Sequence, residues 1–286
     1  MAGPLSGPGP AARSDEPALV GLRCRISEPV AYAHGAEALA RALGARLGTE
    51  PRFIGEIPAD GPRRPHSDDL RDGRGCLLEA GGQVDDALSA GRFPILTHGD
   101  CSIAMGTLPA LARLRPDARV LWLDAHADFN VPEESPSDWL GGMGLAGACG
   151  RWDPGLGLAA FEPDRLVLCG VRDLDEGERE ALEHGPATVI GAALETLVFL
   201  ANALDGAPVY VHVDPDVLDP SIWPCEFPAP DGLSFEKLYD LLEAVAGACE
   251  VIGLEVASYW APADPGERAQ LAKALVDALE PLLPAG

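Results

Sequence analysis

Asp124, His126 and Asp128 stand at alternate positions at the end of the apolar run 120–123. In an extended chain alternate side chains share a face, so these groups can converge on one point. Carboxylates and imidazole together suit divalent cations such as Mg²⁺, Mn²⁺, Fe²⁺ and Zn²⁺. The alternative is a surface strand end with unrelated polar residues, but a charge that follows a buried run needs a counter-charge. The stretch therefore predicts a metal site.

A second stretch repeats this design, because Asp214 and Asp216 follow the β-branched run 209–213. Together with Asp124 and Asp128 they supply four negative charges, which two divalent cations would balance. Two such cations roughly 3.5–4 Å apart can hold a water molecule as hydroxide near neutral pH. These residues therefore indicate metal-assisted hydrolysis.

Apolar strand-like runs alternate with helical segments after a Gly/Pro/Ala/Ser-rich stretch at residues 1–17, which we expect to be a disordered tail. The expected strands are residues 19–26, 52–57, 93–97, 119–124, 165–171, 187–190, 208–214 and 251–257. The expected helices are residues 36–47, 68–90, 103–114, 143–150, 176–183, 194–204, 235–248 and 266–283. Such alternation predicts one α/β domain over residues 18–286, a three-layer αβα sandwich with a mostly parallel sheet. Ligands of such sheets bind beyond the carboxyl ends of the strands, where both acidic stretches fall.

The composition excludes several classes of partner. A formal net charge of −24 argues against nucleic acid or an anionic membrane surface. No apolar run reaches the ~18 residues that a membrane span needs, and the first residues lack the pattern of a signal peptide. Seven scattered cysteines without a C-x-x-C pair favour a reducing, cytoplasmic setting with no disulfide framework.

The two acidic motifs, in this order, resemble those of the ureohydrolases, the family of arginases and agmatinases. The motifs are Asp124-Ala-His126-Ala-Asp128 and Asp214-x-Asp216-x-x-Asp219-Pro220, and the resemblance covers about residues 93–259. It implies hydrolysis of a small guanidino compound by two Mn²⁺ ions per subunit. It also implies that the ligands include Asp124, His126, Asp128, Asp214 and Asp216. A homo-oligomer is a further family-level expectation, since many ureohydrolases are trimers or hexamers.

The chain departs from the family at one ligand position. The family motif Gly-Gly-Asp-His-Ser, whose His binds metal, reads His98-Gly99-Asp100-Cys101-Ser102 here. A thiolate is a soft ligand that suits manganese poorly, and it would add a fifth negative charge. Cys101 is therefore either a weak ligand or a small buried residue without metal contact, and Asp100 is expected to orient the loop from behind the ligands.

The resemblance also assigns substrate contacts. Asn130 and Ser137 match the residues that hold the α-carboxylate of an amino-acid substrate, although ordinary turn chemistry is an open alternative for both. Asp175 matches the residue that receives the α-amino group, and Glu255 matches one that pairs with the guanidinium group. Gly141 stands where the family has a His that shuttles protons.

These departures gather at the guanidino end, where Cys101, Gly141 and the loop 225–230 differ from the arginase pattern. They resemble family members of D-cycloserine biosynthesis, which cleave Nω-hydroxy-L-arginine to L-ornithine and hydroxyurea. Loss of the shuttle His should slow arginine hydrolysis, since such proton transfers contribute ~10²–10⁴-fold. An N-hydroxylated substrate is less basic, and small residues at 101 and 141 leave room for its oxygen. In this mechanism Asp128 moves the proton to the leaving nitrogen.

Two alternatives stay open. One is an arginase, or another guanidino-acid hydrolase that releases urea. The other is a metal-binding protein of this fold that has lost catalysis.

Overall fold

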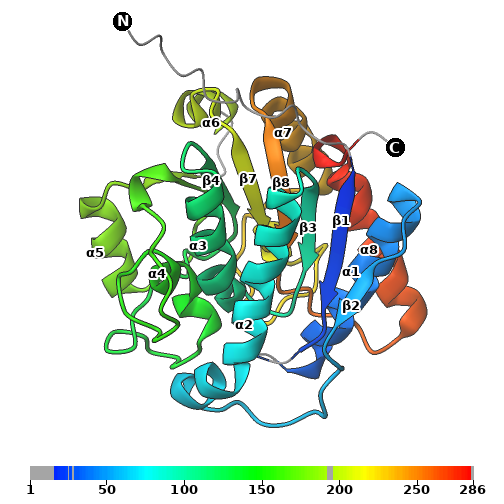
Figure 1. Ribbon diagram of the computed structural model, residues 1–286, viewed down its shortest axis with the longest axis horizontal. Helices are drawn as coiled ribbons and strands as arrows, with labels where there is room; N and C mark the ends of the chain where they lie inside the picture. Colours follow the sequence, from blue (N-terminus) through cyan, green and yellow to red (C-terminus); the bar gives the residue numbers. More distant parts are fainter. Residues whose placement is uncertain (1–15, 25, 28, 192–195, 285–286) are drawn as a thin grey trace, which may run out of the picture.

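The strands of this chain form a single parallel sheet. The computed structural model describes residues 16–24, 26–27, 29–191 and 196–284. Its strands are β1 (Pro17–Leu22), β2 (Arg52–Ile54), β3 (Phe93–Thr97), β4 (Arg119–Leu123), β5 (Leu166–Cys169), β6 (Thr188–Ile190), β7 (Val209–Val213) and β8 (Val251–Val256). They lie in the order β2-β1-β3-β8-β7-β4-β5-β6, and every pair is parallel (Figure 1).

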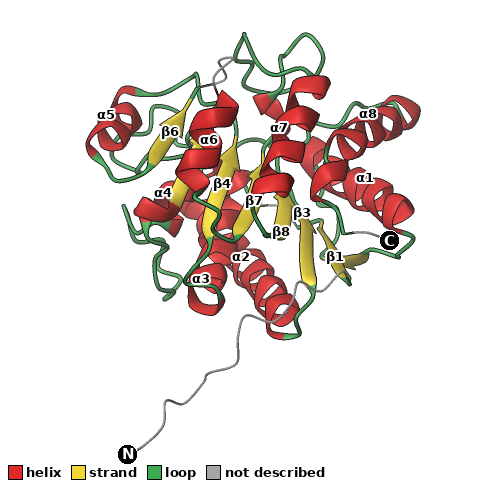
Figure 2. Cartoon of the chain, turned by 90° about the horizontal axis from the view of Figure 1, so that it is seen from above, coloured by secondary structure: helices red, strands yellow, loops and turns green. Residues whose placement is uncertain are grey.

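Helices cover both faces of the sheet (Figure 2). They are α1 (Val30–Leu47), α2 (His66–Ser89), α3 (Ala104–Leu114), α4 (Gly144–Ala148), α5 (Glu176–His184), α6 (Thr196–Leu204), α7 (Phe235–Ala248) and α8 (Pro265–Ala278). Apolar side chains of α1, α6, α7 and α8 share one core cluster. Those of α2, α3, α4 and α5 share a second cluster on the other face. The expectation of a three-layer αβα sandwich is confirmed.

The strands alternate between these two cores, as the sequence pattern requires. In β4, Leu121 and Leu123 enter one cluster while Val120 and Trp122 enter the other, and all four are fully buried. The first strand begins at Pro17 and ends at Leu22, earlier than the expected 19–26. Residues 1–15 lie outside the described residues, so a disordered tail and a domain that starts at residue 18 stay predictions.

Strand order brings distant parts of the sequence together at the carboxyl edge of the sheet. β4 lies beside β7, β7 beside β8 and β8 beside β3, although these strands are far apart in the chain. The register pairs Leu123 with Val213 and Thr97 with Val256, so all four strands end at nearly the same level. The loops that follow them therefore meet at one place, as is usual for open parallel sheets.

The expectation of cysteines without disulfides is wrong for one pair. Cys24, just after β1, and Cys76, in α2, are joined by a disulfide with their Cα atoms 6.3 Å apart. They are separated by 52 positions in the sequence, so only the packing of α2 against the sheet makes them neighbours. None of the helices in the described part of the chain is long and apolar enough to cross a membrane.

Helices α2 and α3 pack so closely that their contact depends on glycine. A Cβ on Gly106 in α3 would lie 1.9 Å from the carbonyl oxygen of Leu77 in α2. A Cβ on Gly81 would lie 2.5 Å from the carbonyl oxygen of Gly106. Because both obstacles are backbone atoms, neither can move aside without a shift of a whole helix.

We therefore expect Gly106→Ala to lower the free energy of unfolding by about 1–3 kcal/mol or more through overpacking. Gly82→Ala is the matched control, because Gly82 is likewise a helical glycine, next to Gly81 in α2, but faces open space. That change should raise the free energy of unfolding by about 0.5–1 kcal/mol through helix propensity. Chemical denaturation of both variants measures this difference. Equal stability of the two would contradict the close packing.

Candidate metal centre

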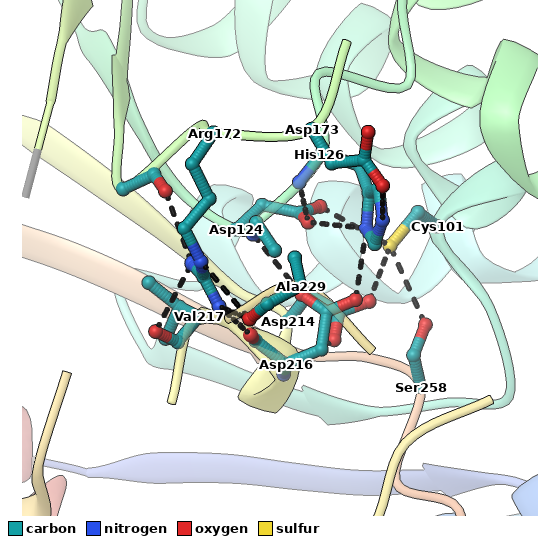
Figure 3. Close-up of polar contacts among 12 residues, drawn as sticks. Cys101, Asp124, His126, Arg172, Asp173, Asp214, Asp216, Val217, Ala229 and Ser258 are labelled. Carbon is teal, nitrogen blue, oxygen red and sulfur yellow. Dashed lines mark hydrogen bonds and ion pairs between the residues drawn. The ribbon is translucent and has the colours of Figure 1, made fainter. Parts of the chain in front are cut away.

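Metal-ligating side chains gather where four strands end. Asp124 directly follows β4 and Asp214 directly follows β7, while Cys101 lies in the turn after β3 and Ser258 lies just after β8. Figure 3 shows Cys101, Asp124 and Asp214 pointing toward one another from these separate loops. The convergence of the two acidic stretches that the sequence predicts is present in the structure.

Backbone amides hold the carboxylates in place. Asp124 Oδ1 accepts a hydrogen bond from the N–H of His126 at 2.7 Å, and Asp214 Oδ1 accepts one from the N–H of Asp216 at 2.9 Å. Asp216 Oδ1 accepts a bond from the N–H of Ala125 at 3.0 Å, which ties the loop after β7 to the loop after β4. The second oxygens of Asp214 and Asp216 contact Cys101 and His126, while Asp124 Oδ2 accepts a hydrogen bond from the indole N–H of Trp122 at 3.0 Å.

His126 completes a three-residue group of potential ligands. Its Nδ1 lies 2.9 Å from Asp216 Oδ2 and 3.6 Å from Asp124 Oδ1 (Figure 3). Ligand atoms of Asp124, His126 and Asp216 all lie within 4.8 Å of one another. Asp128 is buried beside them in the left-handed conformation, with φ of 50°. This mixture of carboxylate and imidazole donors fits a hard or borderline divalent cation.

The electrostatics of the site show that it lacks positive charge. Burial, with repulsion from Asp216 and other carboxylates of the cluster, raises the pKa of Asp124 well above its usual range. Burial likewise raises the pKa of Asp128, and burial with Asp216 raises that of Asp214 to about 7. Burial lowers the pKa of His126, but the charge of Asp216 and hydrogen bonds to Asp124 and Asp216 outweigh it and raise this pKa to about 12. Bound cations would replace these protons, so the donor set fits the divalent metals of the predicted centre.

Cys101 faces the centre. Its Sγ lies 3.2 Å from Asp214 Oδ2, 4.0 Å from Asp124 Oδ2 and 3.5 Å from the hydroxyl of Ser258. Burial and the neighbouring carboxylates raise the pKa of this thiol well above its usual value. Of the two possibilities that the sequence left open, the geometry favours a side chain among the ligands.

Asp100 behaves as expected of a residue that orients the loop. Its Oδ1 accepts hydrogen bonds from the backbone N–H and the hydroxyl of Ser102, and its Oδ2 accepts one from the N–H of Ser27 at 3.1 Å. Both oxygens therefore bind the chain itself, and neither faces the centre.

The residues expected at the amino-acid end divide into two groups. Asn130 Nδ2 donates to Asp175 Oδ2 at 2.9 Å, which joins residues 45 positions apart. Asp175 also begins α5 with a capping box shared with Glu178, whose Oε2 accepts from the N–H of Phe129 at 3.1 Å. Ser137 is exposed, and its hydroxyl accepts from the N–H of Trp139 at 3.3 Å. The structure therefore unites Asn130 with Asp175 and leaves Ser137 in a turn.

Glu255 lies within β8, and the imidazole of His212 lies between it and Cys101. It is fully buried, and its oxygens contact the hydroxyl of Tyr210 at 3.0 Å and Nδ1 of His212 at 2.7 Å. Both oxygens are thus engaged by this chain's own groups, and a guanidinium group would have to displace one of them.

His212 was not among the residues expected from the sequence. Its Nε2 lies 3.4 Å from Cys101 Sγ, so it contacts the centre directly from behind. The signal that could have found it is the alternation along β7, because His212 shares a face of the strand with Asp214 two positions later.

The space beside Gly141 is filled, so the expectation of room for a substrate oxygen is wrong at this position. A Cβ on Gly141 would lie 2.7 Å from Cζ2 of Trp139. The Trp139 ring lies 4.9 Å from that of Phe227, which in turn lies 6.2 Å from the ring of His126. The guanidinium group of Arg63 lies over both aromatic rings, at 5.6 and 4.8 Å. Side chains from three loops, Arg63, Trp139 and Phe227, thus pack on one another beside the centre.

Comparison with known proteins agrees with this geometry. A family model described as the arginase family matches residues 60–279. The N(omega)-hydroxy-L-arginine amidinohydrolase of Streptomyces lavendulae is 39% identical over 258 residues, which cover 88% of this chain and 91% of that protein. The arginase of Bacillus caldovelox is 33% identical over 228 residues, covering 71% of this chain and 75% of that one. The solved structure of the B. caldovelox arginase superposes with a TM-score of 0.79 at 27% identity, covering 92% of this chain and 97% of the other.

The contact between Trp139 and Gly141 predicts coupling between the two positions. Gly141→Ala should lower the free energy of unfolding by about 1–3 kcal/mol, because the new methyl group meets the indole ring. In a Trp139→Ala background the same change should cost much less, since the obstacle is gone. A double-mutant cycle by chemical denaturation measures the coupling. Additive effects would show that the indole does not limit residue 141.

The raised pKa values predict how stability depends on pH. A raised folded-state pKa of an Asp or a His means stability that is lost as pH rises, and the pKa values of Asp214 and His126 are raised to about 7 and about 12. Protein stripped of metal by a chelator should therefore unfold at lower temperature at pH 8 than at pH 6. Added divalent metal should raise the unfolding temperature more at pH 8, because binding displaces these protons. A pH-independent metal effect would contradict the assignment.

Proposed function

Because the chain belongs to the arginase family, whose members depend on a binuclear metal centre, we propose that it hydrolyses Nω-hydroxy-L-arginine to L-ornithine and hydroxyurea with two Mn²⁺ ions per subunit. The observation that carries this proposal is the contrast between the two ends of the site. The pair Asn130–Asp175 suits an amino-acid substrate, whereas Cys101 and Gly141 depart from the arginase pattern.

The candidate ligands for the metals are Asp124, His126, Asp128, Asp214 and Asp216, with Cys101 beside them. When bound, two divalent cations supply Lewis acidity and lower the pKa of a water molecule at the site to about 7. The buried carboxylates balance the charge of the cations, and their backbone hydrogen bonds fix them before substrate arrives. The protein therefore provides a centre that needs little reorganisation.

The side chains assign the remaining steps. Asn130 and Asp175 hold the α-carboxylate and α-amino groups, and Ser137 is proposed to join them when substrate binds. Asp128 accepts the proton of the attacking water and passes it to the departing ornithine nitrogen. No His stands at position 141 to deliver that proton, and such a loss costs ~10²–10⁴-fold in rate. A hydroxyguanidine tolerates this loss better because its N-hydroxyl group makes the carbon more electrophilic and the nitrogens less basic.

The extra oxygen of this substrate needs space on the metal side of the pocket. Trp139 occupies the volume beside Gly141, so that side is closed. The extra oxygen is proposed to lie beside Cys101 instead, whose side chain is shorter than the His of the family. By the same resemblance we infer that the hydroxyurea serves antibiotic (D-cycloserine) biosynthesis and that the enzyme acts in the cytoplasm.

An arginase that releases urea is the second candidate, because the catalytic cluster is shared with relatives named arginase. A non-catalytic metal-binding protein is a third, and the retention of all five carboxylate and imidazole ligand positions argues against it.

The deciding measurement is ornithine release by Mn²⁺-loaded protein with Nω-hydroxy-L-arginine and L-arginine in parallel. We expect kcat/KM to favour the hydroxylated substrate by about 100-fold or more, in line with the missing proton shuttle. Asp128→Asn is the control for background hydrolysis and should abolish both activities. Equal or better use of L-arginine would contradict the substrate assignment, and no turnover of either would favour the non-catalytic protein.

A further inference from the structure

A row of fully buried side chains lies directly behind Cys101. It consists of Trp122 in β4, His212 in β7 and Glu255 in β8, which are neighbouring strands. The register pairs His212 with Trp122 on one side and with Glu255 on the other. The three side chains are therefore placed by three neighbouring strands at the centre of the sheet.

The contacts in this row leave the imidazole of His212 one position. Its ring stacks on the indole of Trp122 with ring centroids 3.5 Å apart and planes 2° from parallel. Its Nδ1 lies 2.7 Å from Glu255 Oε1, and the second oxygen of Glu255 accepts a hydrogen bond from Tyr210 at 3.0 Å. With Nδ1 and the ring face fixed, Nε2 points at Cys101 Sγ, 3.4 Å away.

This arrangement has the form that proteins use to orient a metal ligand. Groups behind the ligands hold them at the correct angle, and removal of such a group typically costs 10–100-fold in metal affinity. Cys101 needs such support because its other close neighbours, Asp124 and Asp214, are carboxylates that repel a thiolate. Ligand atoms of Cys101, Asp124 and His212 lie within 4.8 Å of one another, so the row reaches the centre itself.

Glu255 belongs to this row through its contacts with His212 and Tyr210. An oxygen that contacts His212 at 2.7 Å and a carboxyl group with no exposed surface are not available to substrate without rearrangement. His212 lowers the pKa of this carboxyl group despite its burial, so the pair is electrostatically matched. Two residues beyond β8, the buried Ser258 lies at the centre instead, 3.5 Å from Cys101 Sγ.

We propose that His212 is a positioning residue that holds the sulfur of Cys101 toward Asp124 and Asp214, so that the sulfur ligates a divalent cation. Glu255 acts through His212 and not on the guanidino group of the substrate. The pair Cys101–His212 thus takes the place of the His that the family has at position 101. The proposal rests on the proposed function only for the choice of substrate.

The test uses Co²⁺, whose bond to a thiolate gives a charge-transfer band in the near ultraviolet. The full-length protein should show this band when titrated with Co²⁺, and Cys101→Ser should abolish it. His212→Ala and Glu255→Gln should each weaken Co²⁺ affinity about 10–100-fold and reduce or shift the band. His212→Gln, which can place an amide nitrogen near the position of Nε2, should restore part of it.

Cys169→Ser is the matched control, because Cys169 is also a buried free cysteine but lies in β5 and belongs to the core cluster on the other face of the sheet from Cys101. It should leave the band unchanged. Thermal unfolding of each metal-free variant shows whether the chain is folded, and Glu255→Gln keeps the shape of the side chain if His212→Ala does not fold.

Steady-state kinetics separate the two roles of Glu255. The proposal expects KM for Nω-hydroxy-L-arginine to change less than about threefold in Glu255→Gln at saturating metal. A wild-type cobalt band together with a tenfold rise in KM would overturn it, because Glu255 would then contact substrate. If the wild-type protein hydrolyses neither substrate, the proposed function fails, while the cobalt spectra still decide the role of His212.

Discussion

Four buried carboxylates within one site, Asp124, Asp128, Asp214 and Asp216, are the constraint to which the rest of the structure responds. Like charges in a buried place raise one another's pKa values, and here they also hold a proton on His126 to about pH 12. Such a cluster is costly unless cations occupy it. Its presence at the edge of an otherwise apolar sheet is therefore the strongest physical argument for a metal centre in this fold.

The parallel sheet brings these carboxylates together at one edge. Its central strands are apolar on both faces except for a few buried polar residues such as His212 and Glu255, so most polar side chains gather where β3, β4, β7 and β8 end. Backbone N–H groups in the first turns after β4 and β7 donate hydrogen bonds to one oxygen each of Asp124, Asp214 and Asp216. The second oxygens contact other side chains of the site: Trp122 for Asp124, Cys101 for Asp214 and His126 for Asp216. Close packing of α2 on α3 through Gly81 and Gly106 keeps the covering layer near the sheet.

At the guanidino side of the site, Cys101 and Gly141 stand where the family has larger side chains. The family carries an imidazole at position 101. Here the imidazole of His212, in β7, lies 3.4 Å from the sulfur of the smaller Cys101. A side chain that the family carries at position 141 is absent, and the indole of Trp139 takes its volume. In both cases a large side chain lies against the small residue, from β7 at Cys101 and from the same loop at Gly141.

The sequence by itself determined the ligand types, the alternation of strands and helices, and the place of both acidic stretches at strand ends. These features depend on local spacing, because a two-residue repeat sets the face of a strand and apolar periodicity sets the element. Only the tertiary structure decided the pairs Cys101–His212, Trp139–Gly141, Asn130–Asp175 and Cys24–Cys76. Most of these partners are tens of positions apart in the chain, and the loops that carry them meet through strand order. Glu255 shows the same limit: its type and position suggested a substrate contact, whereas its contacts with Tyr210 and His212 on β7 appear only in the tertiary structure.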